Sequence, residues 1–94
     1  SGVSAMVRVT RLVLDVLKPH HPNGLEFSRA IADRLDQGVI QFSVAEVDEN
    51  TETVVLTIAG ENIHYEDIEE TIRALGASVH SIDEVEVVNG SEAE

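Results

Sequence analysis

The spacing of apolar residues along this chain switches between two periods, and the order of the switches limits the fold more than any single motif does. Alternating or β-branched apolar residues predict four strands, at residues 7–17, 39–47, 54–59 and 77–88. Apolar residues three and four positions apart predict two helices with one inward face each, at residues 24–36 and 64–75. The predicted order is strand, helix, strand, strand, helix, strand.

Prolines and glycines mark where these elements end. The two prolines of the segment KPHHPN exclude a helix or a central strand there, so His20 and His21 are expected in a rigid loop. Gly38 and Gly76 follow the two helical segments, where glycine commonly ends a helix. A polar segment, DENTET, separates the second and third strands and is typical of a hairpin turn.

This order predicts an α+β fold, a ferredoxin-like βαββαβ sandwich whose four-stranded antiparallel sheet has the order 4-1-3-2 and two helices on one face. Residues 7–88 are expected to form this single domain, with residues 1–6 as an added or frayed terminus and residues 89–94 as an acidic tail. In such a sheet, the first and second strands end where the third and fourth begin. Side chains far apart in the sequence are therefore expected to converge at one end of the molecule.

Histidines and carboxylates are the residues that this topology brings to that end. We expect metal ligands at Asp15, Glu46, Asp48, His80 and Asp83, and contacts to a small ligand at Lys18, His20, His21 and Ser81. Because oxygen donors outnumber nitrogen donors, calcium or magnesium is favoured over zinc. A structural role is the alternative, because such loop histidines and turn acids commonly bond to water or backbone groups, and their spacing matches no HExxH or EF-hand motif.

The helices cover only one face of such a sheet, and the other face is expected to be apolar. If Leu12, Leu14 and Val16 face the helices, the outward positions are Val9, Val13, Leu17, Val39, Ala45, Val47 and Val55. A monomer would expose these side chains to water, so we expect a homo-oligomer that covers this face. The last strand can alternate in two ways, because its valines favour one facing while His80 and Ile82 favour the other.

Composition narrows the classes of partner. The chain has eighteen acidic and six basic side chains, a formal net charge of −12, and all but four of the acids follow residue 38. Such a chain repels phosphate backbones and anionic lipids and has no apolar run that could cross a bilayer, so no nucleic acid and no membrane partner is expected. No cysteine is present for a disulfide or thiolate site, and the first residues do not read as a signal peptide, which favours a cytoplasmic protein.

Three segments together carry a family resemblance. They are RLVLDVLKPHHP at residues 11–22, VAEVDENTETV at residues 44–54 and GASVHSIDEVEV at residues 76–87. The chain resembles the uncharacterised archaeal family known as domain of unknown function 211, over roughly residues 7–88. The resemblance implies a ferredoxin-like fold and homo-oligomers, without an established activity. His64 and His21 depart from the family pattern, where an aspartate and an acidic residue are expected; the second exchange makes a nitrogen ligand available.

The sequence supports three functions. The first is a small homo-oligomeric binding or regulatory module that takes a divalent cation or a small molecule at the polar end of the sheet. The second is a small hydrolase or isomerase that uses His20 or His80 beside a carboxylate. It is disfavoured because the sequence shows no nucleophile motif and no glycine-rich phosphate loop. The third is a purely structural assembly protein whose polar end sets only the register of its subunits.

Overall fold

Six elements make up the computed structural model, which describes residues 6–90. In chain order they are β1 (Val7–Pro19), α1 (Gly24–Ala32), β2 (Gly38–Val47), β3 (Thr51–Gly60), α2 (Tyr65–Ala74) and β4 (Ser78–Asn89). The predicted βαββαβ order is confirmed, although both helices are shorter than predicted and β1 and β3 are longer. The predicted termini fall mainly on residues 1–5 and 91–94, which lie outside the described residues.

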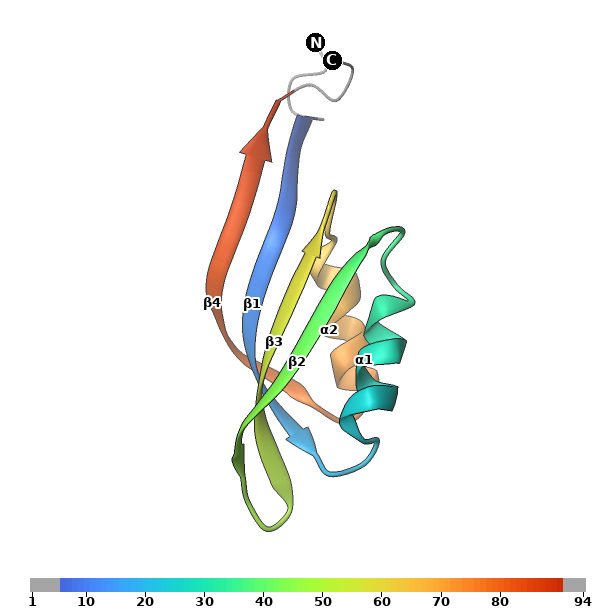
Figure 1. Cartoon of the computed structure of the whole chain (residues 1–94), viewed down its shortest axis with the longest axis vertical. Coiled ribbons are helices and arrows are strands. Elements are labelled where there is room, and N and C mark those ends of the chain that lie inside the picture. The colour runs from blue at the N-terminus through green and yellow to red at the C-terminus, as the bar shows by residue number, and fades with distance from the viewer. Residues whose placement is uncertain (1–5, 91–94) are drawn as a thin grey trace.

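The four strands form one antiparallel sheet in the spatial order β2-β3-β1-β4, as predicted. Both helices lie against the same face (Figure 1). In the middle of β1, every second residue faces the helices and is buried. Leu14 and Val16 are fully covered, while Asp15 between them faces the other side. We call the side without helices the open face.

Apolar side chains of the sheet and both helices form one core. Phe27 and Ile31 of α1 and Ile68 and Ile72 of α2 are buried against Leu12, Leu14, Val16, Val54, Leu56 and Ile58 of the sheet. The Asn23 side chain caps α1 by accepting a hydrogen bond from the Glu26 backbone nitrogen at 2.9 Å. At the start of α2, His64 makes no such bond.

Two irregularities in β4 settle its facing. Asp15 pairs with Ser81 but Val16 pairs with Val79, which leaves His80 as an extra, unpaired residue. A second extra residue, Asp83, lies between the partners of Val13 and Leu14. Such bulges reverse the alternation of a strand locally. They explain why no single alternation of inward and outward residues could predict the facing of this strand.

The facing of two other residues differs from the prediction. Val9 packs against the core on the helix side, because the extra residue Thr10 in β1 reverses the alternation there. Val47 lies opposite Glu52, which the pairing places on the helix side as well. Of the predicted outward residues, the pairing leaves Val13, Leu17, Val39 and Val55 on the open face, while Ala45 is an extra residue without a partner in β3.

The β1 and β4 strands extend past the rest of the sheet as a two-stranded ribbon (Figure 1). Residues 7–9 of β1 pair with β4 alone, since β3 reaches only as far as Arg11. The extents of the molecule are 52 × 22 × 18 Å, so this ribbon makes it markedly elongated.

Candidate functional site

Lys18 is a fully buried charged residue at the end of β1. Its ammonium nitrogen Nζ donates to the Glu52 carboxylate and to the Pro19 carbonyl, both at 2.9 Å. The same nitrogen lies 5.6 Å from the ring centre of Phe27 and 6.0 Å from that of Phe42. The charge is therefore neutralised by Glu52 and surrounded by aromatic faces, which is the environment a buried cation needs.

Glu52 joins this lysine to the loop that follows β1. The Lys18 hydrogen bond is the main cause that holds the pKa of Glu52 below its ordinary value, against the opposing effect of burial. Its other carboxylate oxygen, Oε1, lies 3.7 Å from Nδ1 of His20. The sequence interpretation placed Glu52 in a turn and did not select it. The signal that could have found it was its position opposite Lys18 in the pairing of β1 with β3.

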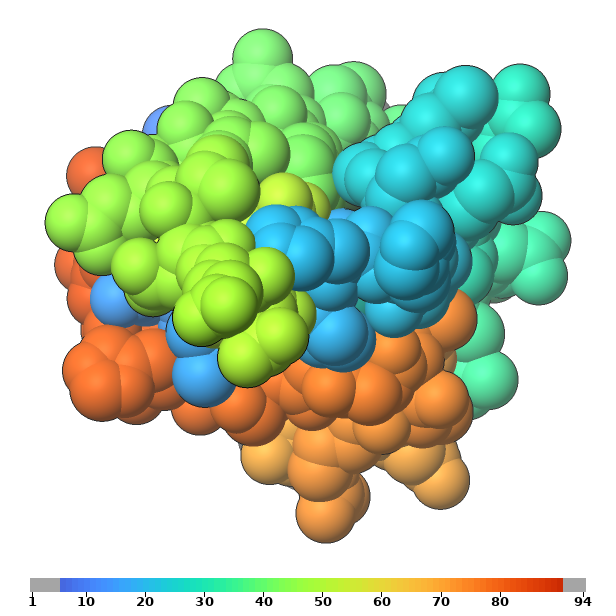
Figure 2. Space-filling view, turned by 90° about the horizontal axis from the view of Figure 1, so that it is seen from below, coloured from blue at the N-terminus to red at the C-terminus, as the bar shows by residue number. Residues whose placement is uncertain are grey.

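His20 is held on both sides of its ring. Its Nε2 atom lies 3.0 Å from the Asp48 carbonyl and 3.1 Å from the Glu49 carbonyl, and Nδ1 faces Glu52. The loop after β1, the β2–β3 hairpin and the start of β4 lie side by side at this end of the molecule (Figure 2). The predicted convergence of these segments is thus present, and His20 fastens the loop to the hairpin.

A second group of the predicted residues lies on the open face. Asp15 of β1 and His80 of β4 line a hollow of about 270 Å³ together with Leu17 and Thr53. Ser81 lies opposite Asp15, and its hydroxyl donates to the Asp83 carboxylate at 2.7 Å. Four predicted residues therefore gather on the same face, three predicted as metal ligands (Asp15, His80 and Asp83) and one predicted to contact a small ligand (Ser81).

The other predicted residues lie apart from that hollow. Glu46 pairs with Thr53 and belongs to the open face, but on the far side of β3 from Asp15. Asp48 contributes its backbone carbonyl to His20, and His21 is exposed in the loop. Among residues 6–90, no three histidine or acidic side chains are already grouped closely enough to hold a metal ion.

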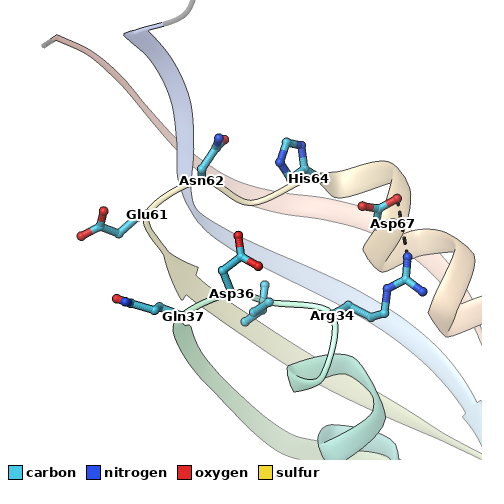
Figure 3. A pocket seen from close by; sticks show the side chains of 8 residues that line it. Arg34, Asp36, Gln37, Glu61, Asn62, His64 and Asp67 are labelled. Carbon is cyan, nitrogen blue, oxygen red and sulfur yellow. Dashed lines mark ion pairs between the residues drawn. The ribbon is translucent and has the colours of Figure 1, made fainter. Parts of the chain in front are cut away.

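A larger hollow, of about 400 Å³, lies where α1 ends and α2 begins and was missed by the sequence interpretation. Polar side chains of the loop after α1, the loop before α2 and the first turn of α2 line it around Leu35 (Figure 3), namely Arg34, Asp36, Gln37, Glu61, Asn62, His64 and Asp67. Arg34 and Asp67 form an ion pair of 3.8 Å across one wall, and Asp36 lies between that pair and Asn62. The sequence feature that pointed to this region was His64, which stands where the family pattern has an aspartate to cap α2.

Comparison with known proteins gives a family and one relative. The model of the DUF211 family, described as "Uncharacterized ArCR", matches residues 10–93. The chain is also similar to an uncharacterised protein of Methanocaldococcus jannaschii, MJ0319, at 39% identity over 77 residues. That match covers 82% of this chain and 79% of the relative. Within the described residues, neither helix is long and apolar enough to span a membrane.

Proposed function

The chain belongs to the domain of unknown function 211 family, and we propose that it works as a homo-oligomeric, non-catalytic binding module that associates through the open face. The observation that carries this proposal is the uncovered sheet itself. Leu17 and Val39 are 43% and 58% exposed there, and Val55 is 37% exposed at the centre of the face. Large aliphatic side chains that gather on one surface commonly mark a protein contact.

The size of the face supports the same proposal. Four strands about 4.8 Å apart, each about nine residues long at about 3.3 Å per residue, give an outline of roughly 600 Å². Side-chain relief increases the accessible area above that outline. A stable interface takes about 800 Å² from each partner. The flat outline of one sheet face is therefore about three quarters of that area, and its side-chain relief adds to it.

The chemistry of His20 supports a binding role over catalysis. A general base must have a free nitrogen that can take a proton from a substrate. Both ring nitrogens of His20 already face oxygen atoms of the protein, and the ring fastens a loop to a hairpin. A cation or a small polar molecule at the open face fits the residues better, since Asp15 and His80 meet there beside a hollow.

The test is the mass of the protein in solution, measured by light scattering and sedimentation at tens of micromolar chain. We expect the wild type to be an oligomer and Val55→Glu to shift it to the monomer, because a charge would be buried in the interface. The matched control is Val87→Glu, at a residue of β4 that is 53% exposed and pairs with Val9, away from the open face. A monomeric wild type, or equal effects of both substitutions, would contradict the proposal.

A further inference from the structure

We infer that Asp15 and His80 form one half of a binding site for Zn²⁺ or a similar divalent metal ion. A second copy of the chain completes the site across the open face. This inference rests on the proposed face-to-face association. The inference adds to that association a divalent ion at the interface, bound by two carboxylates and two imidazoles.

The bulge in β4 is the first argument. A regular strand would have placed His80 on the side of the sheet opposite to Ser81. Because His80 is the extra residue between the pairs Asp15–Ser81 and Val16–Val79, its side chain instead lines the open-face hollow beside Asp15. Bulges cost regular pairing and are found where a strand must redirect a side chain. The irregularity places an imidazole and a carboxylate in the wall of the same hollow.

The lack of protein partners is the second argument. Within the described part of the chain, neither Asp15 nor His80 makes a side-chain hydrogen bond or an ion pair. In contrast, the neighbouring Asp83 accepts a hydrogen bond from Ser81. Covering the open face would remove water from Asp15 and His80, and an unpaired carboxylate in such a place is costly. A metal ion would satisfy both groups at once.

The number and type of donors give the class of ion. One chain supplies a single carboxylate and a single imidazole, too few for a protein metal site. A two-fold contact presents the same residues from both copies, which makes four donors, two nitrogens and two oxygens. Tetrahedral sites of this kind suit Zn²⁺, whereas calcium and magnesium take oxygen ligands. The donors therefore favour a different metal from the calcium or magnesium expected from composition.

Charge explains why a cation would sit between two copies. Each chain carries a formal charge of −12, so two copies repel one another as they approach. The open face adds Glu46, Glu84 and Glu86 to Asp15, against Arg11, which forms an ion pair with Glu84. A divalent ion at the interface offsets part of this repulsion. A second copy is therefore a suitable occupant of the face when the ion is present.

The experiment measures zinc binding and assembly together. Zn²⁺ is titrated into chelator-treated protein by calorimetry, Co²⁺ replaces it for visible spectra, and sedimentation is run with Zn²⁺ or with a chelator. We expect one ion per two chains, tetrahedral Co²⁺ bands, and an assembly that is more than about tenfold tighter with Zn²⁺. His80→Gln and Asp15→Asn should each weaken zinc binding by more than about tenfold. The matched control His21→Gln, in an exposed loop, should not.

The outcomes separate this inference from the proposed function. An assembly that Val55→Glu disrupts but that neither Zn²⁺ nor a chelator changes would overturn the metal site and leave the association standing. The same holds if Ca²⁺ saturates the protein while Zn²⁺ does not, or if the Asp15 and His80 substitutions weaken assembly equally in chelator, which indicates a direct ion pair between subunits. A chain that stays monomeric with and without Zn²⁺ would overturn both.

Discussion

Replacing Lys18 by methionine removes a buried charge while keeping a side chain of similar length. The ammonium group of Lys18 is fully buried and bonds to Glu52, whose side chain is only 14% exposed. The substitution leaves that carboxylate without its cation in a site with little water. Breaking one partner of a buried ion pair costs about 3–5 kcal/mol. A methionine sulfur against the rings of Phe27 and Phe42 returns about 0.3–1.5 kcal/mol, so we expect a net loss of about 2–4 kcal/mol.

A loss of this size is measurable by urea unfolding followed by circular dichroism, because the whole domain is expected to be stable by only about 5–14 kcal/mol. The matched control is Arg11→Met, which breaks the Arg11–Glu84 pair, whose side chains are 43% and 62% exposed. Exposed pairs contribute less than about 1 kcal/mol, so this variant should remain close to the wild type. The two variants therefore replace a long cationic side chain by methionine, one at a buried site and one at an exposed site.

The double variant Lys18→Met with Glu52→Gln separates lost charge pairing from lost packing. Once the carboxylate is neutral, no unpaired charge remains, so at least half of the lost stability should return. For the same reason, the deficit of Lys18→Met alone should shrink when acid protonates Glu52. A loss below about 1 kcal/mol in Lys18→Met, or a double variant no more stable than the single one, would refute the reasoning.

Three further predictions follow from single sites. Because the pKa of Glu52 is lowered on folding, its stabilising effect is complete above its unfolded pKa of about 4.5 and is lost as the pH falls through the lower folded pKa. Urea midpoints measured against pH should show this loss, and Glu52→Gln should abolish the pH dependence. Burial, and then Glu69, raise the pKa of Tyr65, so stability should fall as the pH rises above about 10 and level off once the tyrosinate absorbance of the folded protein appears. This fall should be absent in Tyr65→Phe. A Cβ at Gly24 would lie 2.6 Å from the ring of Phe42, so Gly24→Ala should cost about 1–3 kcal/mol in thermal or urea unfolding, and an unchanged midpoint would disprove the close contact.

The element order was predictable because local patterns and chain geometry agree. The helical stripe around Phe27 and Ile31 and the alternation of Leu12, Leu14 and Val16 each indicate one buried face, and all of these residues are in the core. With six elements in this order, right-handed connections leave little choice of topology. The predicted sheet order and the placement of both helices on one face are confirmed.

The details of the site were less predictable because they depend on pairing between strands. Alternation along a strand assumes regular pairing, and an extra residue such as His80 or Asp83 is recognisable only once the partner strand is known. Lys18 was predicted to contact a small ligand, since lysine is rarely buried, and only its position opposite Glu52 reveals the buried pair. The predicted convergence was correct for the strand ends, yet it did not separate the open face from the loop end.

The bulges that redirect side chains also affect how copies of this chain can meet. Sheets polymerise into fibrils by adding strands to a regular, unpaired edge. Here β2 has an extra residue at Ala45, and β4 has two, at His80 and Asp83, so both edges are irregular. The remaining regular edge of β4 carries Glu84 and Glu86, which repel another acidic strand. These irregular, acidic edges disfavour edge-to-edge aggregation. They leave the flat of the sheet as the surface for the association proposed above.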